Sequence, residues 1–278
     1  MKQDYAGKTV WITGASSGIG RAMALEAARR GAALVLSARR RAALEETAAA
    51  CAPARCAVLD FDLSDPAARA AACDGVAALL GPIDVLVLNA GTSQRATFLE
   101  TPPDAFASIM ALDFEAPVDM VRRTLPSMLA RGSGCLVAVS SIAGLAGAPL
   151  RPAYSAAKHA LSGFFQSLRS ELSGSAIRVV TAYPGFVRTA IDRSALGPGG
   201  RPMGVDDPHT QAGADPESVA RRILNAVLSG RVEPTVAFDL KTRFGLFISR
   251  HIPSLWASLA ARHAGIGTRG RDLPIRSA

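Results

Sequence analysis

The chain has 278 residues, of which 49% are hydrophobic and 19% are charged. This composition predicts one large folded domain or two small ones, and it excludes a disordered chain. The formal charge is +8, but it is unevenly distributed. Residues 240–278, the tail of the chain, carry seven basic residues against one acid and therefore account for +6 of it. Nucleic-acid binding by the rest of the chain is not expected.

Apolar runs alternate with alanine-rich helical stretches along the chain. Strands are predicted at 8–13, 33–38, 56–61, 83–91, 134–141, 177–185 and 234–238. Helices are predicted at 18–30, 40–51, from Asp65 onward, 104–131, after Pro152 and 215–230. The strands are continuous apolar runs, which is typical of a parallel sheet buried on both faces. We therefore predict an α/β fold with a single Rossmann-type, doubly wound parallel sheet of about seven strands and helices on both faces.

Cysteine and histidine spacing speaks against a metal centre. The four cysteines form no CxxC pair, and the four histidines have no ligand-like spacing, so we expect free thiols and no metal. The start of the chain has no apolar stretch with a cleavage site, and no run of 18 apolar residues occurs. We therefore expect a cytoplasmic protein without a membrane-spanning helix.

The stretch TGASSGIG, residues 13–20, lies between the first predicted strand and the first predicted helix. Its glycines at 14, 18 and 20 allow the backbone to approach a pyrophosphate at the positive end of a helix. A glycine- and serine-rich turn without a ligand is the alternative. The strand–turn–helix context favours dinucleotide binding.

The end of the second predicted strand indicates which dinucleotide binds. An NAD site requires an acid there for the ribose 2′-hydroxyl. This chain has Arg39, Arg40 and Arg41 instead, and guanidinium groups suit a 2′-phosphate. We expect NADP(H) to be preferred, with Arg39 and Arg40 at the phosphate and Arg41 at the surface.

Five motifs in this order resemble those of the short-chain dehydrogenases/reductases. They are TGASSGIG, NAG at 89–91, SS at 140–141, YSAAK at 154–158 and PGFVRT at 184–189, and the resemblance covers about residues 7–235. It implies a catalytic domain over residues 1–239, followed by an extension over 240–278. It also implies a homodimer or homotetramer that associates through the long helices at 104–131 and 153–173.

The resemblance assigns roles by position. It places the cofactor against Gly14, Ser16, Ser17, Ile19, Gly20, Asp62, Leu63, Asn89, Ala90, Gly91, Tyr154, Lys158, Pro184, Gly185, Val187 and Thr189. It makes Ser141, Tyr154 and Lys158 catalytic, with Ser140 as the strand neighbour of Ser141.

The chemistry of this trio follows from its residue types. Reduction of a carbonyl requires a hydride, which a nicotinamide supplies, and a proton, which the protein must deliver. A free tyrosine, with a pKa of about 10, is a poor acid–base catalyst near neutrality. Lys158, one helical turn from Tyr154, favours the phenolate, and the Ser141 hydroxyl can donate to the substrate oxygen.

One position departs from the family pattern. The family usually has an asparagine in the helix after NAG, and Asp113 stands there in this chain. A carboxylate near Lys158 would support the charged lysine but weaken its effect on Tyr154. Two alternatives to a charged carboxylate beside Lys158 exist: Asp113 is protonated, or the alignment with the family is shifted by one residue.

Residues 186–214 are rich in glycine and proline and resemble the mobile substrate lid of the family. The expected substrate lining is mostly apolar, with polar residues at its mouth: Ile142, Ala143, Leu145, Phe186, Ile191 and Leu196, and then Thr92, Ser93 and Gln94. This lining favours a small hydrophobic ketone or alcohol, lipid-like or steroid-like. Core packing is the alternative for each residue.

The tail, residues 240–278, is unusual for the family. Phe244, Ile248, Ile252, Leu255, Leu259 and Ile266 form an apolar stripe that Pro253 interrupts, with basic residues interleaved. Such a segment is typical of peripheral contact with an anionic membrane surface. A helix packed on its own domain or on a sister subunit is the other interpretation, and it is the one that we slightly favour.

Three functions fit these features. The leading one is an NADPH-dependent enzyme that interconverts a ketone and a secondary alcohol. A sugar-nucleotide epimerase or dehydratase fits less well, because the region after the sixth strand is short. A non-catalytic NADP(H)-sensing regulatory protein is the alternative from another class, although such proteins commonly lack the tyrosine or the lysine.

Overall fold

A computed structural model describes residues 4–233, 235–236 and 240–266. Within these residues the strands form one parallel sheet in the order β3-β2-β1-β4-β5-β6-β7. The strands are β1 Thr9–Thr13, β2 Ala33–Ala38, β3 Cys56–Asp60, β4 Val85–Leu88, β5 Gly134–Val139, β6 Ile177–Pro184 and β7 Thr235–Val236. The predicted doubly wound sheet is confirmed. The last strand, β7, has two described residues, which lie within the strand predicted at 234–238.

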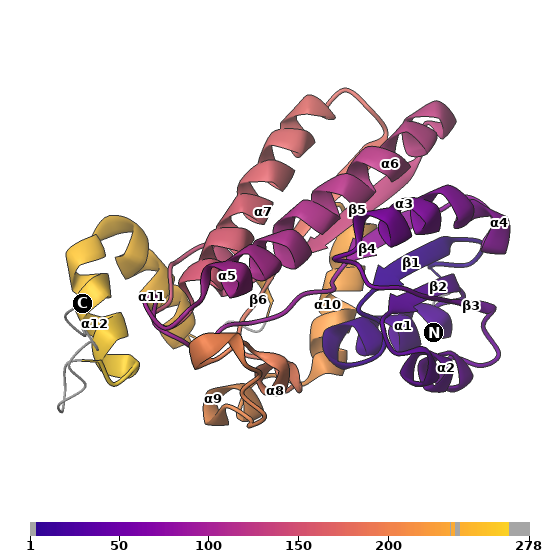
Figure 1. The fold of residues 1–278 in the computed structure, drawn as a ribbon. Coiled ribbons are helices and arrows are strands. Elements are labelled where there is room, and N and C mark those ends of the chain that lie inside the picture. Colours follow the sequence, from indigo (N-terminus) through magenta and orange to yellow (C-terminus); the bar gives the residue numbers. More distant parts are fainter. Residues whose placement is uncertain (1–3, 234, 237–239, 267–278) are drawn as a thin grey trace.

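Helices cover both faces of this sheet (Figure 1). One face carries α1 Gly18–Arg29, α2 Arg41–Ala50 and α10 Pro216–Ser229, and the other carries α3 Pro66–Gly75, α4 Ala77–Leu80, α5 Pro103–Met110, α6 Ala116–Arg131 and α7 Pro152–Glu171. Successive residues of β1 alternate between the two cores, with Val10 and Ile12 on the α1 side and Trp11 on the α6 side. Because both faces are buried, the strands read as unbroken apolar runs.

The predicted long helix at 104–131 contains a wider segment. α5 and α6 are joined by a π-helical segment, η1, at Ala111–Glu115. An α-helix would require the N–H of residue 117 to donate to the carbonyl of Asp113, but residue 117 is proline and has no N–H. The proline explains the local widening, which places Asp113 at the only π-helical segment in the described part of the chain.

Short elements make up the segment between β6 and α10. They are α8 Ile191–Ser194, η3 Pro198–Gly200 and α9 Pro208–Gln211, and a further short helix, η2 Ile142–Gly144, follows β5. Leu196 of this segment pairs with the backbone around Gln94: its N–H donates to Ser93 O at 2.9 Å, and its carbonyl accepts from Arg95 N at 2.8 Å. The predicted lid is therefore attached to the loop that follows β4.

The tail forms a helical hairpin at one end of the molecule (Figure 1). It consists of α11 Leu240–His251 and α12 Pro253–His263, so Pro253 separates the two helices as expected. A Cβ on Gly245 would lie 3.2 Å from the Trp256 ring, and Trp256 Nε1 donates to Gly147 O at 3.2 Å. The hairpin thus contacts the loop after β5. In the part of the chain that is described, no helix combines the length and the apolar character needed to cross a membrane.

Candidate active site

A cavity of about 1580 Å³ runs along the edge where the parallel strands end. Chain segments that leave these strand ends form its walls, as expected for a doubly wound sheet. Eighteen of the predicted site residues line it: Gly14, Ser16, Ser17, Ile19, Arg39, Arg40, Asp62, Leu63, Asn89, Ala90, Gly91, Ser141, Tyr154, Lys158, Pro184, Gly185, Val187 and Thr189. Two predicted residues, Gly20 and Asp113, do not line it.

The glycine loop is packed tightly against the end of β4. Gly14 has φ +69°, and a Cβ there would lie 2.9 Å from Ala90 Cα. A Cβ on Gly20 would lie 2.3 Å from Gly14 O and 2.5 Å from Asn89 Nδ2. The assignment of Gly20 as a cofactor contact is therefore corrected: this glycine lets α1 approach the loop.

The first turn of α1 faces the cavity with its backbone donors available. Ser17, the residue before α1, makes no side-chain hydrogen bond to the helix. Ser16, Ser17 and Ile19 line the cavity at this point. Unpaired N–H groups at the positive end of a helix suit an anion such as a pyrophosphate. The donor set therefore fits a dinucleotide.

The three arginines after β2 have different surroundings. Arg41 donates to Glu45 and Asp60, both at 2.8 Å, on the protein surface. Arg39 and Arg40 instead line the cavity. The pKa of Asp62 is lowered, mainly by a hydrogen bond from Ser64, and the nearby Arg39 adds to this effect. The prediction that Arg41 is a surface residue is confirmed.

Lys158 is buried between three groups. Its Nζ lies 3.2 Å from Asp113 Oδ2, 3.4 Å from Val139 O and 5.7 Å from the centre of the Tyr154 ring. Burial favours a neutral amine, but Asp113 and Tyr154 outweigh it, so the pKa of Lys158 is raised. Lys158 therefore keeps its charge beside the phenol.

Asp113 lies behind the cavity wall. Its Oδ1 accepts from Thr92 N at 2.8 Å, and a Cβ on Gly91 would lie 3.1 Å from its Oδ2. Burial raises the pKa of Asp113, while Lys158 and the Thr92 N–H oppose that rise. A direct catalytic role, which the family position of Asp113 could suggest, is therefore corrected: Asp113 is a positioning residue, because it acts through Lys158.

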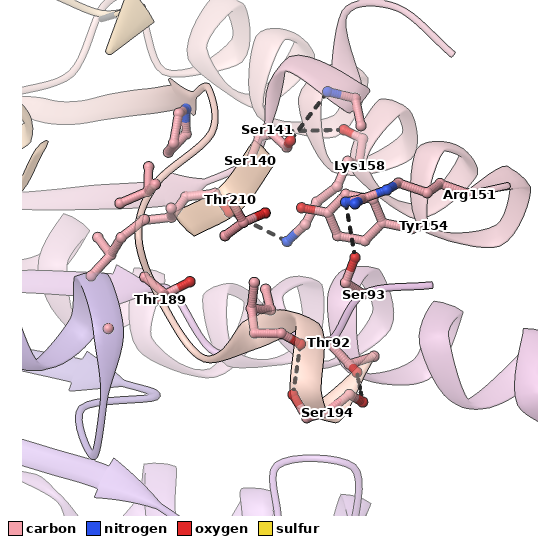
Figure 2. Close-up of a pocket in the computed structure, with 18 of the residues that line it drawn as sticks. Thr92, Ser93, Ser140, Ser141, Arg151, Tyr154, Lys158, Thr189, Ser194 and Thr210 are labelled. Atoms are coloured by element: carbon pink, nitrogen blue, oxygen red, sulfur yellow. Dashed lines mark hydrogen bonds between the residues drawn. The ribbon is translucent and has the colours of Figure 1, made fainter. Parts of the chain in front are cut away.

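The two serines after β5 have separate roles. Ser141 lines the cavity, and its Oγ accepts from Ala143 N at 3.1 Å, which leaves its O–H free to donate elsewhere. Ser140 Oγ lies 3.2 Å from Lys158 O and 3.0 Å from Ser162 Oγ, so it ties β5 to α7. Figure 2 shows Ser141, Tyr154 and Lys158 around the same part of the cavity.

The predicted substrate lining is found in part. Ile142, Ala143, Phe186, Ile191, Leu196, Thr92 and Ser93 line the cavity. Leu145 does not line it and is 37% exposed. Gln94 does not line it either: it is fully buried, and its Oε1 accepts from Ala153 N at 2.8 Å and Tyr154 N at 3.4 Å. The placement of Leu145 and Gln94 in the cavity is therefore wrong.

Several lining residues were not predicted. Trp256, Leu246 and Leu259 of the tail hairpin form an apolar wall. Arg151 lines the cavity next to Tyr154, and its guanidinium donates to Ser93 at 3.3 Å (Figure 2). No local pattern distinguishes these residues from surface ones, since they reach the cavity only through the packing of distant segments.

Two arginines connect the lid to the body of the protein. Arg151 lies 3.7 Å from Asp192 and 3.6 Å from Asp207, and Arg95 forms an ion pair with Asp207. Both aspartates are buried and belong to the lid. Opposite charges balance in this cluster, so it attaches the segment of Asp192 and Asp207 to the loops of Arg95 and Arg151 and leaves no excess charge for an anionic substrate.

The family model of the short chain dehydrogenases matches residues 8–196. Dehydrogenase/reductase SDR family member 7B of Bos taurus is 36% identical over 95% of this chain and 83% of its own length, and the related 7-like protein of Drosophila melanogaster is 35% identical over 95% and 82%. A short-chain dehydrogenase structure from Streptomyces avermitilis has a TM-score of 0.77 at 30% identity, over 94% of this chain and 98% of that one. A metagenomic short-chain oxidoreductase in complex with NADP has a TM-score of 0.71 at 28% identity, over 85% and 100%.

Proposed function

Because the chain belongs to the short-chain dehydrogenase/reductase family, we propose that it is an NADPH-dependent oxidoreductase that interconverts a ketone and a secondary alcohol on a hydrophobic substrate. The observation that carries this proposal is the position of Ser141, Tyr154 and Lys158 in one cavity with the glycine loop. The bound nicotinamide would supply or accept the hydride.

Each member of the trio has a distinct part in the proposed reaction. During reduction, the Tyr154 hydroxyl gives its proton to the substrate oxygen as the hydride reaches the carbonyl carbon. The Lys158 ammonium, 5.7 Å from the phenol ring, favours the phenolate that remains. The Ser141 hydroxyl donates to the same substrate oxygen while negative charge develops on it. In oxidation the phenolate accepts the alcohol proton.

The preference for NADP(H) rests on the end of β2. Arg39 and Arg40 line the cavity there, and no carboxylate stands at Ala38 to accept bonds from a ribose 2′-hydroxyl. Similar structures include one in complex with NADP and one in complex with NAD, so they support a nicotinamide cofactor, and the choice of NADP(H) rests on the two arginines.

The hydrophobic substrate is inferred from the far wall of the cavity. Ile142, Leu150 and Phe186 belong to the loops around the trio, and Leu246 and Trp256 belong to the tail hairpin. A lipid-like or steroid-like body would be buried against these side chains. Their apolar area favours such a body over a sugar phosphate.

Steady-state NADPH oxidation with a panel of hydrophobic ketones tests the proposal. Turnover is expected with at least one ketone. Tyr154→Phe is expected to lower kcat roughly a thousandfold, and Ser141→Ala roughly a hundredfold. Tight NADPH binding without turnover on any ketone would favour the alternative, a non-catalytic NADP(H)-sensing regulatory protein.

We further propose a cytoplasmic homodimer or homotetramer that touches membranes peripherally through the tail. Phe244 and Phe247 are 63% and 56% exposed, with Arg243 and Arg250 exposed on the same helix. Apolar rings flanked by cations suit an anionic lipid surface. Co-sedimentation with phosphatidylserine-containing vesicles should fall at least fivefold in the Phe244→Asp, Phe247→Asp double variant. Equal sedimentation of both proteins would rule out the tail as a membrane contact, and light scattering would give the subunit number.

A further inference from the structure

The amino end of α7, which carries Tyr154, is capped by a residue from another part of the chain. Pro152 is the first residue of α7 and has no N–H. The N–H groups of Ala153 and Tyr154 would be unpaired, because the helix offers them no carbonyl. Arg151, the residue before the helix, provides no side-chain cap.

Gln94 supplies the missing acceptor. Its Oε1 lies 2.8 Å from Ala153 N and 3.4 Å from Tyr154 N, while Ser155 N donates to Arg151 O at 2.8 Å. The backbone N–H groups of Ala153, Tyr154 and Ser155 therefore all have an acceptor, and Pro152 has no N–H that needs one. The side chain of Gln94 is fully buried, so water cannot take its place.

Contacts on its other side hold Gln94 in this orientation. Its Nε2 donates to Thr101 Oγ1 at 2.6 Å, and the Thr101 hydroxyl donates to Thr97 O at 2.7 Å. The backbone on either side of Gln94 is bonded to Leu196 of the lid. The amide thus cannot rotate without losing one of these bonds, and its oxygen stays directed at α7.

We propose that Gln94 is the positioning residue of Tyr154, and that its neutral amide keeps the positive end of α7 available to the phenolate; the proposal rests on the proposed function of Tyr154. Tyr154 is the third residue of α7, within the turn where the helix dipole acts. Helix caps are often aspartates, as at Asp65 before α3 and Asp215 before α10. A carboxylate at position 94 would add a negative charge beside the group that must become an anion.

Two variants separate the two parts of this proposal. Gln94→Met has a similar size but only a weakly accepting thioether in place of the amide oxygen, so it removes the cap. Gln94→Glu keeps an acceptor for Ala153 and Tyr154 and adds a charge. The two N–H groups keep this charge ionised, and the Thr101 hydroxyl can donate to it only by turning away from Thr97 O. Asp215→Ala is the matched control, because it removes a cap from α10, where Oδ2 accepts from Ser218 N at 3.1 Å.

A spectroscopic titration reads the result without the need for turnover. Tyrosinate formation is followed by ultraviolet absorbance as the pH rises, and the curve of Tyr154→Phe is subtracted. The chain has three tyrosines, and burial raises the pKa of both others, Tyr5 and Tyr183. The difference curve therefore reports on Tyr154 even if no ketone is a substrate.

Gln94→Glu is expected to melt within a few degrees of the unchanged protein and to move the midpoint of the difference curve up by roughly one pH unit. Gln94→Met is expected to lower the melting temperature and, with a ketone substrate, to lower kcat roughly tenfold while KM for NADPH stays within twofold. Asp215→Ala should lower the melting temperature and leave the midpoint unchanged. The proposal would be overturned if the midpoint of Gln94→Glu were unchanged, or if Gln94→Met were as stable as the original protein. If the original protein turned over no ketone, that result would count against the proposed function alone.

Discussion

Lys158 and Asp113 form a buried ion pair in which Nζ and Oδ2 are 3.2 Å apart and the side chains are 6% and 0% exposed. Such a pair, once desolvated, depends on both partners, because removal of one leaves the other charge unpaired. Here the lysine also faces Tyr154, with Nζ 5.7 Å from the ring centre. The positive charge of Lys158 therefore interacts with both the Asp113 carboxylate and the Tyr154 phenol.

Asp113→Asn is expected to retain or raise activity at neutral pH. The amide removes the competing carboxylate, so the Lys158 ammonium acts more fully on Tyr154. The measurement is kcat for ketone reduction at pH 7, compared with Tyr154→Phe. A loss as deep as that of Tyr154→Phe would show that the carboxylate itself is required.

The same variant should lose activity earlier on the alkaline side. Burial lowers the pKa of Lys158, and Asp113 is the main group that raises it above the ordinary 10.5. Without Asp113 the lysine loses its proton at a lower pH, so the rate should begin to fall below pH 10.5, where the original protein still holds the charge. Full pH–rate profiles of both proteins test this, and superimposable alkaline limbs would contradict it.

Arg39→Ala should weaken the preference for NADP(H). If the guanidinium binds the 2′-phosphate, the ratio of KM for NADPH to KM for NADH should rise at least tenfold, because a charge-assisted hydrogen bond is lost. Arg41→Ala is the control, since Arg41 is paired with Glu45 and Asp60 and should not change the ratio. A KM for NADH equal to or below that for NADPH in the original protein would refute the preference.

Trp256→Ala should open the apolar wall of the cavity. The indole lines the cavity and donates to Gly147 O, so its loss removes both substrate contact and the attachment of the tail. KM for a hydrophobic ketone should rise roughly tenfold, while KM for NADPH stays unchanged. Phe98→Ala, which removes a 67% exposed ring outside the cavity, serves as the control. Equal effects of the two substitutions would exclude Trp256 from substrate binding.

Stability should fall at alkaline pH through a buried thiol. Burial raises the pKa of Cys135 from 9.0 to about 12, so between these values the folded state binds more protons than the unfolded state. The free energy of unfolding should therefore fall as pH rises, by up to about 1.4 kcal/mol per pH unit from this thiol. Urea unfolding at pH 8, 9.5 and 10.5 tests the slope. Cys135→Ala should show a shallower slope, and an identical slope would assign the effect to other groups.

Features that depend on nearby residues could be predicted from the sequence alone. The continuous apolar strands, the glycine loop after β1 and the four-residue spacing of Tyr154 and Lys158 follow from strand burial, backbone freedom and helix periodicity. These local patterns determined the parallel sheet and the identity of the residues that line its carboxyl edge. They also placed Arg41 at the surface and the interruption of the tail at Pro253.

Only the tertiary structure decided which residues act on Tyr154 and where the substrate wall comes from. Gln94 reaches α7 from 60 residues away, and Pro117 widens the helix that brings Asp113 beneath Gly91. Gly20 does not line the cavity, because α1 packs against Gly14 at this point. Trp256 lines it, because the tail hairpin packs against the loop at Gly147. The physical reason is the same in each case: hydrogen bonding and packing between segments far apart in the chain have no periodicity that a single sequence can display.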